Sequence, residues 1–178
     1  MALPRLHIDL DAIVANWRMF QRRVEPAYAA AVVKANAYGL GADTVAGALS
    51  KAGCSRFYVA WPSEGGALRR TLGAAPEITV FHGPTSDTMD VFQMYQLVPV
   101  LNHLEQIDLW VSGNISPRPA AMHVDVGMNR LAGGRLVGCP GTHEECALGR
   151  THERDRVEPF GLGVDGLRIA HSGRARVS

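Results

Sequence analysis

The stretch that decides the fold is Ala29-Ala-Ala-Val-Val-Lys34-Ala-Asn-Ala-Tyr38-Gly-Leu-Gly41. Its first five residues form a continuous apolar run, short enough for a buried β-strand, and the two glycines near its end interrupt regular structure. Lys34 is expected at the end of this strand, because an unpaired ammonium inside a buried strand is unfavourable. Two interpretations follow. The Lys34 amine either extends from the strand end into solvent, or it forms a Schiff base with an aldehyde cofactor.

Composition places the chain among ordinary globular proteins. It has 178 residues, of which 47% are hydrophobic and 20% charged, enough for one domain with a sizeable core. The net charge of +1 gives no reason to expect nucleic acid or an acidic membrane surface as a partner. No apolar run reaches the roughly 18 residues of a membrane span. There is no secretory signal pattern, and three scattered cysteines are too few for a disulfide framework. A cytoplasmic location is expected.

Strand-like and helix-like segments alternate along the chain. Strands are predicted over residues 6–10, 29–34, 57–60, 78–81, 97–101 and 120–125, and helices over residues 11–24, 43–51, 62–72, 85–95 and 104–111. This order predicts parallel strands joined by crossover helices. A doubly wound sheet and a (β/α)8 barrel both satisfy it. No Gly-x-Gly-x-x-Gly follows a first strand, so the dinucleotide-binding version lacks its main signal.

Three blocks of sequence occur in an order typical of one enzyme family. They are Leu6-His-Ile-Asp-Leu-Asp-Ala-Ile-x-x-Asn16, then Val32-Val-Lys-Ala-Asn-Ala-Tyr-Gly39, and finally His123-Val-Asp-Val-Gly-Met-Asn-Arg-Leu131. The second resembles the pyridoxal-phosphate lysine motif of alanine racemases, and the third resembles their Val-Asp-Thr-Gly-Met-x-Arg-Leu segment. The first resembles their N-terminus. The resemblance covers about residues 5–132, somewhat under three-quarters of the chain.

The resemblance implies an α/β fold that is part of a (β/α)8 TIM-like barrel. In the family the barrel begins with the lysine strand, so residues 1–131 are expected to supply about five βα units. The predicted strand over residues 6–10 belongs, in the family, to a C-terminal β domain, and the rest of that domain is expected to be missing here. Reactive residues of such barrels lie at the carboxyl ends of strands, where Lys34 and residues 125–130 both fall.

Residues 132–178 are expected to form a divergent tail. They contain nine of the nineteen glycines and seven arginines, but a single Phe and no Trp or Tyr. Apart from a weak apolar run over residues 161–170, no periodicity is evident. We interpret the tail as the product of a frame-shifted or truncated gene, largely disordered, with an independent insertion as the alternative. Four residues of the zinc-ligand types lie close together in it, but their spacing is not that of a standard finger, and we assign no metal site. They are Cys139, His143, Cys146 and His152.

The resemblance also implies roles for individual residues. Lys34 would form the Schiff base with pyridoxal phosphate and act as a base on one face of the α-carbon of alanine, while a tyrosine of the second subunit of a homodimer acts on the other face. Lys51, the one other lysine, follows a helix and is expected to be solvated. Tyr38 matches a tyrosine that contacts the cofactor phosphate; the alternative is a packing aromatic. Arg130 matches an arginine near the phenolic oxygen of the cofactor and the substrate carboxylate, which a guanidinium holds bidentately; the alternative is a surface arginine.

The chain departs from the family pattern at three positions. Leu40 replaces a common histidine, Val126 replaces a Thr or Ser, and His123 stands where many members carry a lysine that is carbamylated and orients the arginine. Asn129 or an anion would then have to hold Arg130. The opposite-face tyrosine and most of the phosphate-binding backbone lie further along in the family.

The resemblance implies an isomerase that interconverts L-alanine and D-alanine, which would supply D-alanine for peptidoglycan. The chain by itself is expected to be poorly active, because losing one acid–base partner alone removes about 10²–10⁴-fold in rate. The alternatives are a non-catalytic fragment that binds pyridoxal phosphate and another pyridoxal-phosphate-dependent barrel protein.

Overall fold

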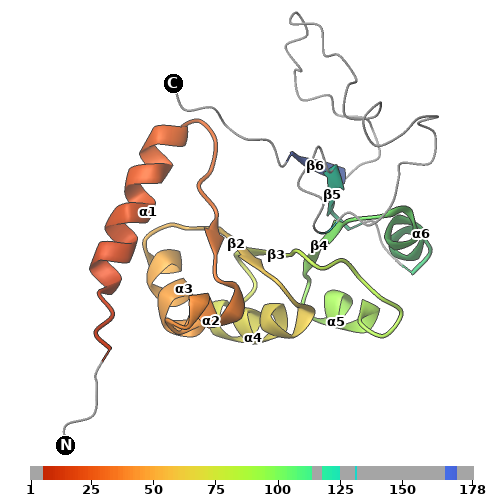
Figure 1. Ribbon diagram of the computed structural model, residues 1–178, viewed down its shortest axis with the longest axis horizontal. Coiled ribbons are helices and arrows are strands. Elements are labelled where there is room, and N and C mark those ends of the chain that lie inside the picture. Colours follow the sequence, from red (N-terminus) through yellow and green to blue (C-terminus); the bar gives the residue numbers. More distant parts are fainter. Residues whose placement is uncertain (1–5, 114–117, 125–130, 132–166, 172–178) are drawn as a thin grey trace, which may run out of the picture. The chain divides into compact units, whose positions relative to one another are not determined.

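The computed structural model describes residues 6–113, 118–124, 131 and 167–171, the last five by their backbone. The chain divides into two compact units, residues 1–99 and 100–178, and each is described by itself. Both contain helices and parallel strands (Figure 1). The first unit contains α1 (Leu10–Val24), β1 (Ala31–Val32), α2 (Lys34–Tyr38), α3 (Ala42–Lys51), β2 (Arg56–Val59), α4 (Pro62–Leu72), β3 (Glu77–Val80) and α5 (Met89–Met94). Strand β4 (Val98–Leu101) crosses the boundary, and α6 (Leu104–Gly113), β5 (Ala120–Val124) and β6 (Leu167–His171) follow.

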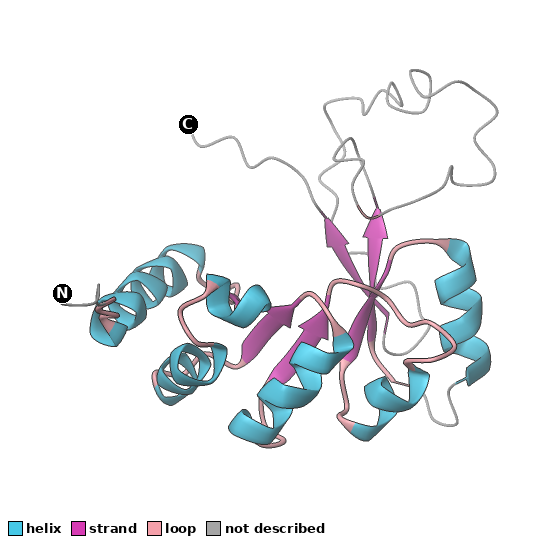
Figure 2. Cartoon of the chain, turned by 60° about the horizontal axis from the view of Figure 1, so that its bottom comes forward, coloured by secondary structure: helices cyan, strands magenta, loops and turns pink. Residues whose placement is uncertain are grey.

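Every strand pairs in parallel with the next strand along the chain. In the first unit Phe57 of β2 lies between Ala31 of β1 and Ile78 of β3, and Thr79 pairs with Val98 of β4. In the second unit Ala121 of β5 lies opposite Val100 of β4 and, on its other side, Arg168 of β6. Parallel pairing requires a crossover between successive strands, and from β1 to β5 the described helices supply it. Figures 1 and 2 show α3 and α4 along one face of the strands of the first unit.

The core of the first unit forms where the strands meet these helices. Phe57, Ile78 and Val80 are fully or almost fully buried, as are Leu68 of α4 and Phe92 of α5. Strand β2 alternates between half-buried and buried residues, whereas β3 is buried over its last three residues. A strand covered on both faces reads as a continuous apolar run rather than an alternation, so β3 is the more central of the two.

Helix α4 approaches the loop before β4 closely because it contains two adjacent glycines. A Cβ atom at Gly65 would lie 2.8 Å from Cδ1 of Leu97, and one at Gly66 would lie 2.9 Å from Cε2 of Tyr95. Arg69, near the end of the same helix, donates from Nε to the carbonyl of Tyr95 at 2.9 Å and from Nη2 to that of Gln96 at 3.0 Å. These contacts fix α4 against the sheet and so position its first turn, which carries part of the candidate site.

The predicted order of strands and helices is confirmed, with several corrections. The predicted strand over residues 6–10 is wrong: residues 6–9 belong to no strand, and α1 begins at Leu10. The reason is Asp9, whose Oδ1 accepts from the backbone N–H of Ala12 at 2.9 Å and caps the helix. The predicted helix over residues 85–95 begins only at Met89, because Thr85 and Thr88 form a hydrogen-bonded turn before it.

Two further differences concern the extent of one strand and the presence of another. The strand predicted over residues 29–34 is shorter, and Lys34 already belongs to the following turn. The sequence analysis also found no strand in the tail, whereas β6 pairs with β5 over five residues, from Leu167 opposite Ala120 to His171 opposite Val124. The weak apolar run over residues 161–170 was the local signal for it. The other expectations for residues 132–166 and 172–178 lie outside the described residues. No helix in the described part is both long and apolar enough to cross a membrane.

Candidate functional site

Lys34 lies two residues after the last residue of β1, at the carboxyl end of the strand. The backbone N–H of Val33 donates to the carbonyl of Tyr58 at 2.9 Å, which carries the pairing with β2 up to this lysine. The Lys34 side chain is half-buried, and its Nζ lies 5.8 Å from the ring centroid of Phe81, within cation–π range. Phe81 follows β3 and stacks on Tyr58 of β2, with ring centroids 5.2 Å apart. The amine therefore lies beside the carboxyl ends of three parallel strands, as predicted for a reactive residue of a barrel.

The backbone after Lys34 forms one turn of left-handed helix, α2. Its φ angles are 51° at Ala35, 55° at Asn36, 53° at Ala37 and 56° at Tyr38. The ψ angles of the first three are 47–48°. For L-residues the left-handed helical conformation is unfavourable by about 1–2 kcal/mol per residue. Four consecutive residues persist in it only because their surroundings determine it, and such strain is concentrated at functional sites.

Backbone and side-chain hydrogen bonds hold the left-handed turn from within. The N–H of Ala37 donates to the carbonyl of Val33 at 2.9 Å, and the N–H of Gly41 donates to the carbonyl of Asn36 at 2.9 Å. The Asn36 Oδ1 accepts from the N–H of Ala42 at 2.8 Å, at the start of α3. Ala37 is 4% exposed and anchors the turn in the core. Gly39, with φ of 88°, ends the turn in a conformation that glycine adopts without strain.

Glu64 of α4 holds the same turn from outside. One carboxylate oxygen, Oε1, accepts from the N–H of Ala35 at 2.6 Å. The other, Oε2, accepts from the N–H groups of Ala60 and Trp61 at 2.8 and 3.0 Å. Glu64 is the third residue of its helix, where an acidic side chain accepts from the residue before the helix. Here the cap extends to a second segment, so one carboxylate joins the ends of β1 and β2.

Two rings stack at the ends of β2 and β3. The centroids of Trp61 and His82 are 3.9 Å apart and their planes are inclined by 11°. His82 Nδ1 lies 2.9 Å from the carbonyl oxygen of Ala60, so this nitrogen carries the proton and donates it. The sequence analysis missed Glu64, Trp61 and His82. The signal for the two rings was their place directly after predicted strands, and for Glu64 it was the spacing of a helix cap.

Tyr38 lies on the left-handed turn and is 64% exposed. An exposed phenol does not fill a core, so the alternative interpretation of Tyr38 as a packing aromatic is not supported. Its predicted contact with a phosphate group stays a prediction. Arg130, together with Val126 and Asn129, lies outside the described residues, and the predictions made for them remain predictions.

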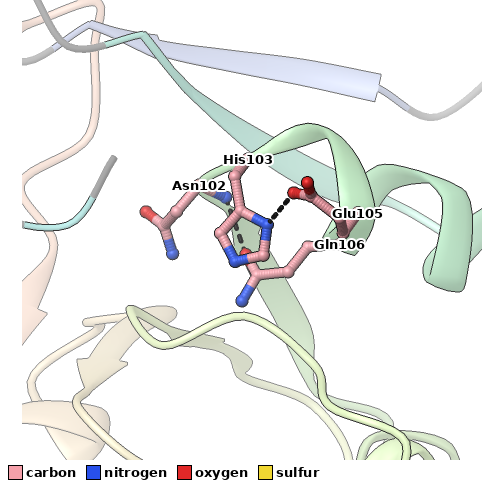
Figure 3. A network of polar contacts seen from close by, with 4 residues as sticks. All are labelled: Asn102, His103, Glu105 and Gln106. Atoms are coloured by element: carbon pink, nitrogen blue, oxygen red, sulfur yellow. Dashed lines mark hydrogen bonds and ion pairs between the residues drawn. The ribbon is translucent and has the colours of Figure 1, made fainter. Parts of the chain in front are cut away.

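In the second unit His123 of β5 is held by Asn102, which follows β4. The Asn102 Nδ2 donates to the carbonyl of Val100 at 3.0 Å, so the amide presents Oδ1 to the ring of His123. His123 Nδ1 lies 3.0 Å from that oxygen and therefore carries the proton. Asn102 is buried, and its own N–H donates to Oε1 of Gln106 at 2.8 Å (Figure 3). His123 thus has a fixed ring position.

The neighbouring pair of His103 and Glu105 is exposed by comparison. His103 Nδ1 lies 2.8 Å from Oε2 of Glu105 (Figure 3). The pKa of Glu105 is lowered, first by a hydrogen bond from its own backbone N–H and then by that of His103. Because the Glu105 carboxylate is fully exposed, this pair has little influence on stability.

Cys54 is a buried free cysteine of the first unit. Burial raises the pKa of the Cys54 thiol above its ordinary value of 9.0, so the thiol stays protonated and unreactive at neutral pH. Over the described ranges, no three residues of the His, Cys, Asp and Glu types gather in a way that could hold a metal ion. The sequence pattern from Cys139 to His152 lies outside those ranges.

Parallel β/α units in chain order, with a lysine amine at the carboxyl end of the first strand, define the chain as part of a TIM-like barrel. Residues 8–136 match the family described as alanine racemase, N-terminal domain, and the chain belongs to this family. It is similar to the alanine racemase of Cereibacter sphaeroides, with 45% identity over 132 residues, or 74% of this chain and 38% of the relative. It is also 45% identical over 134 residues to that of Rhodospirillum rubrum, covering 73% of this chain and 36% of the relative.

Solved structures confirm the partial barrel. The alanine racemase of Bartonella henselae, described with covalently bound pyridoxal phosphate, superposes with a TM-score of 0.64 at 37% identity, over 70% of this chain and 37% of that one. The alanine racemase of E. faecalis gives a TM-score of 0.63 at 32% identity, over 71% of this chain and 35% of that one. The chain thus spans less than two-fifths of the length of these relatives and structures.

Proposed function

We propose that this chain provides the cofactor-binding part of an alanine racemase, with Lys34 as the residue that binds pyridoxal phosphate. The observation that carries the proposal is the Lys34 amine, half-buried at the carboxyl end of β1 and followed by a strained turn that Glu64 and Asn36 hold. A primary amine fixed in this way suits attack on an aldehyde carbon. The structure from Bartonella henselae, described with covalently bound pyridoxal phosphate, supports the choice of cofactor.

Each residue has a defined task in this proposal. Pyridoxal phosphate, when bound, spreads the negative charge that develops as the α-carbon of an amino acid loses its proton. Lys34 supplies the amine that bonds the cofactor and, once released, takes or returns the α-proton of alanine on one face. Tyr38, whose phenol is exposed on the left-handed turn, donates to the phosphate. Arg130 binds the substrate carboxylate through its planar guanidinium.

Racemisation needs a second acid–base group on the opposite face of the α-carbon. No residue of this chain is assigned to that task, and the chain spans 38% of the length of its relative from Cereibacter sphaeroides. We therefore expect residues 1–178 by themselves to bind pyridoxal phosphate at Lys34 with little turnover.

Homodimer formation, a cytoplasmic location and the supply of D-alanine for peptidoglycan belong to the same proposal. A non-catalytic pyridoxal-phosphate-binding protein is the second candidate, favoured by the same lysine.

A titration with pyridoxal phosphate tests the proposal. The wild-type chain is expected to develop saturable absorbance at about 420 nm as the cofactor bonds a lysine. Lys34→Ala should abolish it, whereas Lys51→Ala, which removes the other lysine, should not. Borohydride reduction followed by peptide mass analysis should place the pyridoxyl group on Lys34.

An assay of D- and L-alanine interconversion on the same sample separates the two candidates. Turnover that disappears in Lys34→Ala would establish the racemase, and labelling without turnover would favour the non-catalytic binder. Absorbance unchanged in Lys34→Ala would contradict both.

A further inference from the structure

The Glu64 carboxylate contacts both the left-handed turn after Lys34 and the end of the neighbouring strand, β2. Among the hydrogen bonds described above, no other side chain does so. Its two oxygens accept from Ala35, at 2.6 Å, and from Ala60 and Trp61, at 2.8 and 3.0 Å. These are three backbone N–H donors on one side chain, and hydrogen bonds to a charged acceptor are stronger than those between neutral groups. The contact with Ala35 spans 29 positions in the sequence and joins α4 to α2 (Figure 1).

The contact with Ala35 bears directly on Lys34. The N–H of Ala35 belongs to the peptide group whose carbonyl carbon is that of Lys34, and this group is planar. Holding the N–H therefore fixes the plane on the carboxyl side of the Lys34 Cα. On its other side, the peptide group adjoining the Lys34 Cα contains the Val33 carbonyl, which accepts from the N–H of Ala37 at 2.9 Å. The Lys34 Cα–Cβ direction is thus set from both sides, once within the left-handed turn and once by Glu64.

The same carboxylate also holds the backbone at the end of β2 and, through it, a residue that follows β3. Glu64 holds the N–H of Ala60, and the carbonyl of Ala60 accepts from the ring of His82 at 2.9 Å. His82 stacks on Trp61, whose own N–H Glu64 also holds. Displacement of the carboxylate would therefore shift the ends of β1, β2 and β3 together.

We propose that Glu64 is a positioning residue for Lys34, which aligns the lysine amine for its bond to the cofactor. The inference rests on the proposed function, because it assigns the positioning of the same amine. An amide is a poor substitute at this position: one of the two oxygens becomes an NH2 group, which is a donor only and would face a backbone N–H. Either the Ala35 contact or the Ala60 and Trp61 contacts would then be lost.

Glu64→Gln tests the proposal, with Glu77→Gln as the matched control. Glu77 is the first residue of β3 in the same unit, and its Oε1 is 3.9 Å from Nε of Arg56. Glu77→Gln therefore removes the same charge as Glu64→Gln, but at the amino end of a strand. We expect Glu64→Gln to weaken the binding of pyridoxal phosphate by about tenfold or more, since small displacements of reacting groups have large effects. Glu77→Gln should leave this binding within about twofold of the wild type, although both variants are expected to unfold at lower urea concentrations.

A second readout does not depend on the cofactor. Limited acetylation with acetic anhydride, followed by mass analysis, gives the reactivity of Lys34 relative to Lys51 within one sample. Glu64→Gln should change this ratio by about threefold or more, and Glu77→Gln should not. If the wild-type chain does not bind pyridoxal phosphate, the proposed function fails, and the acetylation ratio still decides the role of Glu64.

The proposal is overturned if Glu64→Gln retains both the wild-type affinity for pyridoxal phosphate and the wild-type acetylation ratio. It is also overturned if Glu77→Gln changes both quantities to the same extent, because Glu64 would then act through overall stability. Should Glu64→Gln fail to fold, Glu64→Asp replaces it. Aspartate keeps the charge but shortens the side chain by one methylene, and the same expectations and contrary outcomes apply.

Discussion

The indole ring of Trp61 lies parallel to the imidazole ring of His82, with centroids 3.9 Å apart and planes inclined by 11°. Trp61 follows β2 and His82 follows β3, so the stack joins the carboxyl ends of two neighbouring strands. The hydrogen bond of His82 to the carbonyl of Ala60 keeps its ring in this orientation. Although Trp61 is 55% exposed, its ring therefore has a defined position at the end of β2.

Trp61→Ala is expected to lower the free energy of unfolding by about 1 kcal/mol, because aromatic pairs contribute about 0.5–1.5 kcal/mol beyond the area they bury. Urea unfolding followed by circular dichroism measures this. Trp61→Phe retains a ring over His82 and should recover most of the loss. If Trp61→Phe and Trp61→Ala are equally destabilised, the stack has no stabilising effect.

Two glycines in helices are expected to respond to alanine in opposite directions. At Gly65 the new Cβ would lie 2.8 Å from Cδ1 and 3.1 Å from Cδ2 of the buried Leu97. Overpacking of this kind destabilises by about 1–3 kcal/mol. At Gly47 of α3 a Cβ meets nothing within 4 Å, and alanine should stabilise the helix by about 0.5–1 kcal/mol. Urea unfolding of the two variants checks this. If the urea midpoints of Gly65→Ala and Gly47→Ala both rose, α4 would be able to shift away from the loop before β4.

The sequence predicted the order of elements well because that order depends on local signals. The apolar run before Lys34 and the glycines after it indicate a strand and its end without reference to distant residues. The same reasoning failed over residues 6–10, where apolar and polar residues alternate as in a strand. A strand needs a neighbour to pair with, and Asp9 instead caps α1.

The candidate site was predictable only in part for the same reason. The apolar run before Lys34 indicated its place at a strand end, and the resemblance to alanine racemases indicated its role. The left-handed turn was not predicted, since Ala35 and Ala37 have high propensity for the right-handed helix. Part of what holds the turn is a carboxylate 29 positions away, which no pattern within the turn reveals. The Trp61 and His82 stack likewise depends on two strands lying side by side.

The buried thiol of Cys54 makes a prediction about pH. Desolvation raises its pKa above 9.0 in the folded chain, although hydrogen bonds with the backbone of Arg56 and Ala31 act in the opposite direction. A pKa that is higher in the folded state than in the unfolded state contributes stability that is fully present below the unfolded value. This contribution is lost as the pH rises through the folded value. The urea midpoint of the wild type should therefore fall more steeply between pH 8 and about pH 10 than that of Cys54→Ala. Parallel pH profiles for the two proteins would show that the Cys54 thiol does not contribute.

Asn36 lies in the second position of the left-handed turn and has two properties that favour it there. Asparagine adopts positive φ more readily than most residues, and its Oδ1 accepts from the N–H of Ala42 at the start of α3. Asn36→Ala loses both and is expected to lower the free energy of unfolding by about 1–2 kcal/mol. Asn36→Asp keeps the acceptor and much of the conformational preference, so its free energy of unfolding should fall by less than half as much.

Because the turn follows Lys34 directly, Asn36→Ala should also weaken pyridoxal-phosphate binding, whereas Asn36→Asp should largely preserve it. Chemical unfolding and cofactor titration of the two variants, measured side by side, check both expectations. Equal losses of stability in Asn36→Ala and Asn36→Asp would mean that the hydrogen bond to Ala42 does not hold the turn.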